Sequence, residues 1–448
     1  MRTYQFTLTL LAAAALAGCG GGGNSSESGS ASQASAGVTM DDIQAYDNGN
    51  TTVRATAAGG VGFFPSVTSQ VTFGDSLSDV GTYGVGTVAA LGGGKFTINE
   101  VVNGKNLSRT WTEWMALGFG LPTPCAAQTG LDGLATQGFN VPVVNHAGCT
   151  SYAQGGARVS NPVGPGNKLL GGGNAVLGQL TVPVTTQVAK HLSLNGGQFN
   201  GKEMVYVLAG ANDVFMQLAG LSAGATAAAT AAITAAVPAQ ISADIAAGTC
   251  LPANASTTCV SAAVAELTPT VGAAAGGAYF QTNAPAAVGA MGAAGVELAN
   301  LVNTQMLAKG AKRVTVINVP DISKTPFAAT QTPAVQGLVN QMVTTFNTQL
   351  KANLATGPAV LFVDAYTISR DQVANPAKYF LNNVTTPACD LTPAKNALGS
   401  SLVCTTKNLI PGVVKRFQFA DGVHPTPYAH GLLAVAVSTA VLQKGWLR

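Results

Sequence analysis

The chain contains the segment Gln70-Val71-Thr72-Phe73-Gly74-Asp75-Ser76-Leu77-Ser78-Asp79, in which a run of β-branched and aromatic residues meets a glycine and a polar stretch. This composition predicts a buried strand that ends in a tight turn. Ser76 follows the turn and opens a predicted helix, so its backbone N–H points outwards and the helix dipole favours negative charge nearby. We therefore take Ser76 as the candidate nucleophile. The alternative is that Ser76 only caps the helix.

Four more short apolar runs have the length and composition of buried strands, at residues 141–144, 204–208, 314–319 and 359–363. With residues 70–73 they make five strands separated by helical stretches, which predicts a parallel sheet in an α/β fold. Ligands of such sheets bind beyond the carboxyl ends of the strands. Because Gly74, Gly210 and Pro320 each come just after one of these runs, we expect three loops to converge at one edge of the sheet.

Three further motifs follow Ser76 along the chain. They are Gly155-Gly156-Ala157, Gly210-Ala211-Asn212-Asp213 and Asp421-Gly422-Val423-His424. Together with Ser76 they offer a nucleophile, two separate donors for an oxyanion and an acid-base pair, which are the parts that acyl transfer requires.

The base for a serine nucleophile must be a side chain whose pKa lies near 7, and the chain has four histidines, His146, His191, His424 and His430. His424 is favoured because Asp421, three residues earlier, can hold the ring nitrogen that faces away from Ser76. The other three lack this arrangement. We interpret His146 and His191 as surface or packing residues and His430 as part of the last helix.

On these four motifs the chain resembles the SGNH or GDSL family of serine esterases and lipases, from about Ser69 onwards. The resemblance implies a three-layer α/β fold, flavodoxin-like in outline, with a short parallel five-stranded sheet. It also implies an oxyanion hole made by the backbone N–H groups of Ser76 and Gly156 and by the side-chain amide of Asn212. An Asx turn is the alternative role for Asn212. Asp75 and Asp79 are interpreted as structural braces.

The activity that this resemblance implies is hydrolysis of a carboxylic ester through an acyl-enzyme, with a Ser76-His424-Asp421 triad and neither metal nor cofactor. Acyl transfer to another alcohol, removal of O-acetyl groups from glycans, and a non-catalytic binding role at the cell surface are the alternatives. With 22 basic and 19 acidic residues and only 9% of residues charged, the chain lacks the electrostatic footprint of a nucleic-acid-binding protein. The low charge suits an apolar partner, such as a lipid or another acyl ester.

The N-terminus has the features of a bacterial lipoprotein signal. Arg2 precedes an apolar stretch at residues 6–17, which is shorter than the ~20 residues of a membrane-spanning helix and ends in Leu16-Ala17-Gly18-Cys19. We predict a signal peptide over 1–18, then a lipidated Cys19 and a polar tether over 19–66, and a hydrolase domain over 67–448. Gly20 rather than aspartate after the cysteine favours, by analogy, a lipoprotein of the outer membrane. An ordinary secretory signal is the alternative.

Six of the seven cysteines remain when Cys19 is set aside: Cys125, Cys149, Cys250, Cys259, Cys389 and Cys404. They fall into three sequence-local pairs, and of roughly 15 connectivities the pairing of neighbours closes the shortest loops. In an oxidising compartment these pairs should be disulfides that contribute ~2–4 kcal/mol each. Reduced cysteines are the alternative, and none of the spacings is that of zinc ligands.

The family resemblance does not extend to residues 217–299. Residues 223–237 are rich in alanine and threonine and carry no charge, which predicts a helical insertion, stapled by Cys250 and Cys259. A lid over the site, a wall of the substrate pocket, and a decoration without direct function all remain open for this insertion.

Overall fold

The computed structural model describes residues 37–47, 66–103, 105–250 and 257–446, and every structural statement below concerns these residues. The predicted signal peptide, Cys19 and most of the predicted tether lie outside the described residues. The helices and strands are α1 (Met40–Asp47), β1 (Ser69–Gly74), α2 (Gly86–Ala90), β2 (Val101–Val102), β3 (Lys105–Asn106), α3 (Trp111–Gly118), β4 (Gln128–Asp132), β5 (Asn140–Asn145), α4 (Gly172–Leu177), α5 (Val184–Leu194), β6 (Glu203–Leu208), α6 (Ala211–Ala246), α7 (Thr257–Leu267), α8 (Ala273–Leu301), β7 (Val314–Ile317), α9 (Pro326–Ala329), α10 (Pro333–Asn353), β8 (Val360–Val363), α11 (Ala365–Ala374) and α12 (Pro427–Lys444).

The central sheet has four parallel strands in the order β1-β6-β7-β8. Strands β1, β6 and β7 are buried on both faces, as the continuous apolar runs predict, whereas the edge strand β8 is partly buried. In β6 the side chains of Met204, Tyr206 and Leu208 pack on one face of the sheet, whereas Val205 and Val207 pack on the other. The sheet therefore separates two hydrophobic cores.

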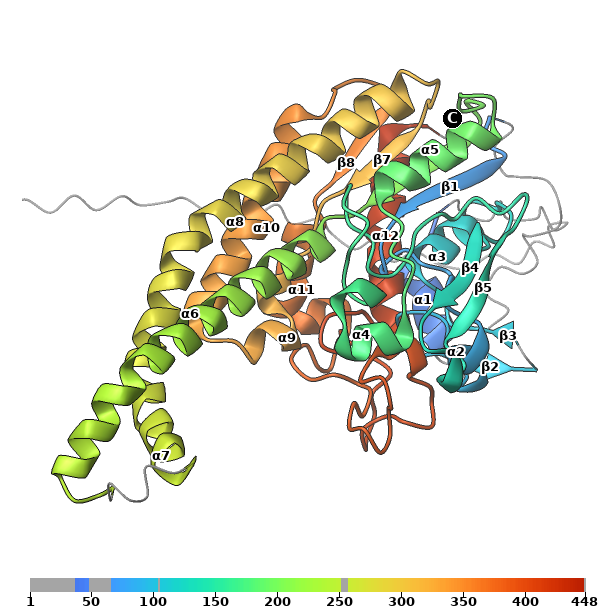
Figure 1. Ribbon diagram of the computed structural model, residues 1–448. Helices are drawn as coiled ribbons and strands as arrows, with labels where there is room; N and C mark the ends of the chain where they lie inside the picture. The colour runs from blue at the N-terminus through green and yellow to red at the C-terminus, as the bar shows by residue number, and fades with distance from the viewer. Residues whose placement is uncertain (1–36, 48–65, 104, 251–256, 447–448) are drawn as a thin grey trace, which may run out of the picture. The chain divides into compact units, whose positions relative to one another are not determined.

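Helices cover both faces of this sheet (Figure 1). On one face, α3 and α12 pack their apolar side chains, including Trp111, Trp114 and Val437, in the same core as Met204. On the other face, α5, α8 and α10 contribute Val188, Leu298 and others to the core of Val205. The expected three-layer α/β architecture is confirmed.

The prediction that residues 141–144 form a fifth strand of this sheet is wrong. Residues 141–144 lie in β5, which pairs antiparallel with β4 in a separate two-stranded sheet, and Val143 and Val144 are exposed. Beside β1 the chain around Ser151 instead makes a single bridge to Thr72. The N–H of Thr72 donates to the carbonyl of Thr150 at 3.0 Å, and the N–H of Tyr152 donates to the carbonyl of Thr72 at 2.8 Å. A run of four apolar residues is too short to tell a buried parallel strand from a surface hairpin.

The predicted insertion is helical. It forms most of α6, which has 36 residues, together with α7 and most of α8, and Figure 1 shows α6 and α8 running side by side towards α7. A glycine also allows α8 to approach α10 closely, since a Cβ on Gly295 of α8 would lie 2.4 Å from the carbonyl oxygen of Phe346 in α10. By length and composition alone, α6 and the helical run Thr257–Leu307 would suffice to cross a membrane. The first turns of α6, however, carry Asn212 and pack in the core of this domain.

Helix α1 lies within the stretch predicted as tether, yet it packs on the domain. The N–H of Val38 donates to Ser438 Oγ at 2.8 Å, Ile43 is 1% exposed, and Asp47 pairs with Arg416 at 2.9 Å. Residues 37–47 are therefore part of the folded domain, because Ile43 supplies an apolar contact that the polar composition around it conceals.

The three predicted disulfides are present. They join Cys125 to Cys149, Cys250 to Cys259, and Cys389 to Cys404. Each closes a short loop, as the sequence-local spacing predicts.

Candidate active site

The candidate nucleophile Ser76 lies in the loop that follows β1. Gly74 ends this strand with a φ of +151°, and a Cβ there would lie 2.2 Å from the carbonyl oxygen of Leu208 at the end of β6. Only glycine permits this approach, which brings the loops after two neighbouring strands together.

Ser76 does not open a helix, contrary to the prediction. The chain makes a single turn in which the N–H of Ser78 donates to the carbonyl of Asp75 at 3.0 Å, and the next helix begins at Gly86. The carboxylates of Asp75 and Asp79 accept the N–H groups that a helix would have used. A helix dipole is therefore not the source of positive potential at Ser76.

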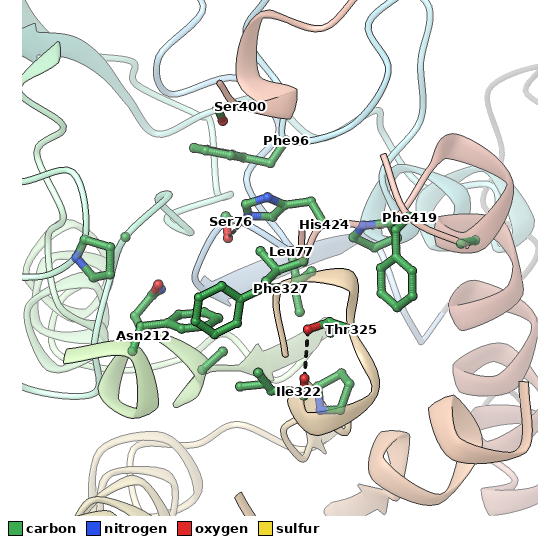
Figure 2. A pocket seen from close by; sticks show the side chains of 18 of the residues that line it. Ser76, Leu77, Phe96, Asn212, Ile322, Thr325, Phe327, Ser400, Phe419 and His424 are labelled. Atoms are coloured by element: carbon green, nitrogen blue, oxygen red, sulfur yellow. Dashed lines mark hydrogen bonds between the residues drawn. The ribbon is translucent and has the colours of Figure 1, made fainter. Parts of the chain in front are cut away.

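Ser76 and His424 meet although 348 positions separate them in the sequence. Nε2 of His424 lies 2.8 Å from Oγ of Ser76, and Nδ1 of the same ring lies 2.8 Å from Oδ2 of Asp421. Figure 2 shows the imidazole ring turned towards the serine at the centre of the site. The sequence argument for these three residues therefore corresponds to one continuous hydrogen-bonded chain of side chains.

Asp421 is held in its ionised form. It accepts hydrogen bonds from the backbone N–H groups of Ser401 at 2.8 Å, Val423 at 2.9 Å and His424 at 2.8 Å. Burial by itself would raise the pKa of Asp421, but the charge of His424 and these hydrogen bonds hold it well below its usual range. A carboxylate so fixed can orient the ring and stabilise an imidazolium.

Ser76, Gly156 and Asn212, the predicted oxyanion donors, line one cavity. Among the described residues, no acceptor is found for the backbone N–H of Ser76 or for that of Gly156. Gly156 has a φ of +78°, and a Cβ there would lie 2.1 Å from the carbonyl oxygen of Pro165, so the position requires glycine. The side-chain amide of Asn212 donates one hydrogen to the carbonyl of Ala157 at 2.8 Å, and its second hydrogen is free for a ligand. Asn212 lines the same cavity as Ser76.

Two aspartates connect the motifs to one another. Oδ2 of Asp79 accepts the N–H of Gly155 at 2.9 Å, which ties the serine loop to the glycine loop. Asp213 accepts the N–H of Val159 at 3.1 Å and pairs with Arg158 at 2.9 Å, which ties the asparagine loop to the same segment. These contacts give the predicted brace role of Asp79 a structural basis. They also show that Asp213 braces the site, a role that the sequence does not reveal.

Gln187 in α5 is a positioning residue that the sequence does not reveal. Its Oε1 accepts the N–H of Gly74 at 2.9 Å, and its Nε2 donates to the carbonyl of Gly74 at 2.8 Å. The contact spans 113 positions, and a lone glutamine in an amphipathic helix gives no signal of it.

Asp75 differs from Asp79, the other aspartate of the Ser76 loop. It is fully buried, its Oδ1 accepts the N–H of Leu77 at 3.0 Å, and its Oδ2 lacks a partner among the described residues. Burial raises the pKa of Asp75 to about 7, against the lowering effect of the Leu77 hydrogen bond.

The model of the GDSL-like lipase/acylhydrolase family matches residues 71–437. The chain belongs to this family. Comparison with curated proteins gave no match. As a GDSL-like hydrolase the protein is a serine ester hydrolase, and the matched residues contain the Ser76 loop, the Asn212 motif and the His424 loop.

A competing motif in this GDSL-like hydrolase lies far from a strand end. Gly220-Leu221-Ser222-Ala223-Gly224 has the spacing of the nucleophile elbow of α/β-hydrolases. It lies inside α6, whereas an elbow requires a turn between a strand and a helix. Spacing alone therefore does not make Ser222 a nucleophile.

The remaining histidines serve packing in the hydrolase. His191 lies in α5 at 1% exposure against Phe199, and burial lowers its pKa to about 4. His430 lies buried in α12, and burial lowers its pKa to about 3. His146 Nε2 lies 2.8 Å from Thr129 Oγ1 in the β4-β5 hairpin. Within the described parts of the chain, no group of three or more His, Cys, Asp or Glu side chains could hold a metal ion.

The site opens into a cavity of about 780 Å³ with largely apolar walls. Its polar centre is Ser76, His424 and Asn212, and aromatic rings of four phenylalanines form much of the wall: Phe96, Phe215, Phe327 and Phe419. The Phe96 ring lies 4.9 Å from the His424 ring, centroid to centroid. Of the described residues between 216 and 319, none lines this cavity. The described part of the insertion therefore does not contribute to the wall of this cavity.

Proposed function

We propose that this GDSL-like hydrolase cleaves an ester by a Ser76-His424-Asp421 triad through a covalent acyl-enzyme. The single observation that carries the proposal is the hydrogen-bonded chain from Ser76 Oγ to His424 Nε2, at 2.8 Å, and from His424 Nδ1 to Asp421. A nucleophile, a base and an orienting carboxylate in this order are sufficient for nucleophilic catalysis at neutral pH.

The reaction runs in two halves. Ser76 Oγ attacks the carbonyl carbon while His424 Nε2 takes its proton, and the N–H groups of Ser76, Gly156 and Asn212 stabilise the oxyanion. Each such donor lowers a barrier of this kind by ~2.7–4 kcal/mol. The protonated His424 then gives its proton to the leaving alcohol, which leaves an acyl group on Ser76. In the second half a water molecule, activated by His424, attacks the acyl-enzyme and releases the acid.

The walls of the cavity support an apolar acyl ester as the substrate. A site for acetylated glycans would need many polar groups for the sugar hydroxyls. Polar side chains such as Asn174, Gln179 and Gln418 do line this cavity, but most of its surface is apolar. We therefore favour esterase or lipase activity over glycan deacetylation.

The decisive experiment compares two serines. Ser76→Ala is expected to lower kcat for p-nitrophenyl butyrate on the order of 10⁶-fold, because the nucleophile is lost while the fold is kept. The matched control is Ser222→Ala, which removes the hydroxyl of the competing motif and is expected to retain hydrolysis. A Ser76→Ala enzyme with unchanged kcat would refute the triad.

We also propose that the protein is exported and held at a membrane, preferably the outer membrane, by acyl chains on Cys19. The N-terminal sequence supports export, and so do the three disulfides, which persist in oxidising compartments. Each buried methylene of an acyl chain contributes ~0.8 kcal/mol, so two or more chains would give firm anchoring. Secretion without an anchor is the alternative.

A further inference from the structure

A second hollow of about 630 Å³ adjoins the active-site cavity. It is a groove that runs along α6, with walls from α8 and from the start of α10, and its lining includes Leu218, Ala219, Ala225, Phe280 and Val335. Among the described residues that line it, none is charged. The part of α6 between Asp213 and Asp244 carries no charged residue at all.

The groove and the active-site cavity share two residues, Phe215 and Phe327. Their rings meet edge to face, with centroids 5.4 Å apart and planes at 88°. Both side chains are half-buried, and Figure 2 shows Phe327 facing the space around Ser76. The ring pair is therefore the boundary between the two hollows.

The ring of Phe327, and not its backbone, is the part that can open this boundary. The N–H of Phe327 donates to the carbonyl of Gly422 at 2.8 Å, within the loop that carries Asp421 and His424. A backbone shift at Phe327 would disturb the triad loop. A side-chain rotation would not, and rotations of accessible side chains take only nanoseconds.

We propose that the groove along α6 binds the distal part of a long acyl chain, which passes between Phe215 and Phe327 from the ester carbonyl at Ser76. This inference rests on the proposed function and names its substrate class as esters of long-chain fatty acids. An uncharged, largely apolar surface joined to the reaction centre fits a hydrocarbon chain, because each buried methylene gains ~4-fold in binding.

The acyl group, and not the alcohol, is the part that faces this groove. The leaving alcohol must lie at His424 Nε2, because that atom returns the proton. Phe215 lies one helical turn after Asn212, on the side of the proposed oxyanion hole. In Figure 2, Phe419 is seen on the far side of His424 from Asn212, so the wall near Phe419 is the one left for the alcohol.

The groove also has the length of a long chain. Its α6 wall extends from Phe215 to Ala229, which corresponds to ~21 Å at ~1.5 Å per residue. Blocking it at two distances from Ser76 should therefore set two different limits on chain length.

The test uses two blocking variants and one matched control. Ala219→Phe places a ring one turn beyond Phe215, and Thr226→Phe places a ring ~10 Å farther along the helix. Ala227→Phe adds the same ring at an exposed position of α6 that does not line the groove. The measurement is kcat/KM for p-nitrophenyl esters from butyrate to palmitate, with thermal unfolding to verify the fold.

We expect Ala219→Phe to lower the ratio of palmitate to butyrate kcat/KM by more than ~10-fold, because each methylene excluded from the groove loses ~4-fold in binding. In this variant kcat/KM should fall for every ester longer than medium chain length. Thr226→Phe should lower kcat/KM only for the esters with the longest chains, and Ala227→Phe should leave the dependence of kcat/KM on chain length unchanged. Free palmitate should inhibit butyrate hydrolysis less in both blocking variants. Identical profiles in all three variants would overturn the groove proposal while butyrate hydrolysis, and with it the triad, stands. Loss of butyrate hydrolysis in Ser76→Ala tests the triad separately.

Discussion

At the scale of single residues, three aspartates near Ser76 have different electrostatic environments. Asp421 receives three backbone N–H groups and faces His424, so its pKa is held low. Asp79 accepts three backbone N–H groups as well, from Gly81, Thr82 and Gly155. Asp75 receives only one, from Leu77, and burial raises its pKa to about 7. Burial raises the pKa of Asp79 in spite of its three donors, so the number of donors does not decide which carboxylate ionises easily. Asp421 differs from the other two because its carboxylate contacts the His424 ring directly.

The raised pKa of Asp75 predicts a pH-dependent stability. Between its unfolded pKa of ~3.9 and its folded pKa of about 7, the folded state binds more protons, so stability falls as pH rises, by at most about 4 kcal/mol. Asp75→Asn keeps an oxygen for the Leu77 N–H and removes the titration. The free energy of unfolding of this variant, minus that of wild type, should therefore become more positive from about pH 4 to about pH 8.

Urea unfolding at several pH values measures this effect, and the exposed Asp41→Asn is the control for the same chemical change. Parallel pH profiles for wild type and Asp75→Asn would contradict the assignment. The stabilising effect of Asp421, which is present above its unfolded pKa and lost as pH falls below it, is common to both proteins and cancels in the difference.

At the scale of elements, the sequence predicts what is local. The runs at residues 70–73, 204–208, 314–319 and 359–363 form β1, β6, β7 and β8, because short continuous apolar runs bounded by turn residues are typical of buried parallel strands. The sequence does not predict what long-range contacts decide. Residues 141–144 form an exposed hairpin, the turn after Ser76 is fixed by carboxylates, and Gln187 reaches Gly74 across 113 positions.

The candidate site was more predictable than its supports. Ser76, Asp421 and His424 lie in motifs whose order and residue types carry chemical information, and the structure brings them together. Asp213 and Gln187 act by orienting loops, and such roles depend on which segments pack together in three dimensions.

Two disulfides allow a prediction at this scale. Cys389–Cys404 lies beside the triad loop, because the N–H of Cys389 donates to the carbonyl of Ala420 at 2.9 Å and Ser401 donates to Asp421 at 2.8 Å. Cys250–Cys259 joins the segment after α6 to the start of α7. The bridges Cys389–Cys404 and Cys250–Cys259 have sequence separations of 15 and 9, so removal of either should lower the free energy of unfolding by a similar ~3 kcal/mol.

Replacing both cysteines of a pair by alanine should therefore separate stability from catalysis. The variant without Cys389–Cys404 should lose kcat for p-nitrophenyl butyrate, because Asp421 loses its alignment, whereas the variant without Cys250–Cys259 should keep it. Chemical denaturation and kcat of both variants are the measurements. Equal losses of kcat would show that the bridge at the triad loop has no special role.

At the scale of the whole molecule, the folded domain begins earlier than composition suggests. The N–H of Gly37 donates to the carbonyl of Gly118 at 2.9 Å, and α1 packs beside α12. The proposed anchor at Cys19 is thus separated from the domain by residues 20–36, which number seventeen and span at most ~60 Å. A hydrolase on such a tether would stay within reach of the lipid surface that carries it.

The proposed anchor predicts where the protein is found in a Gram-negative cell. Cys19→Ser removes the thiol that would be acylated, so this variant should leave the membrane fraction or persist as a larger precursor that retains residues 1–18. Gly20→Asp keeps the thiol and should stay in the membrane fraction, but move from the outer to the inner membrane. Membrane fractionation with detergent phase partition measures both, and butyrate hydrolysis verifies the fold. Equal membrane partition of wild type and Cys19→Ser would exclude a lipid anchor at this cysteine, and a soluble wild type would favour plain secretion.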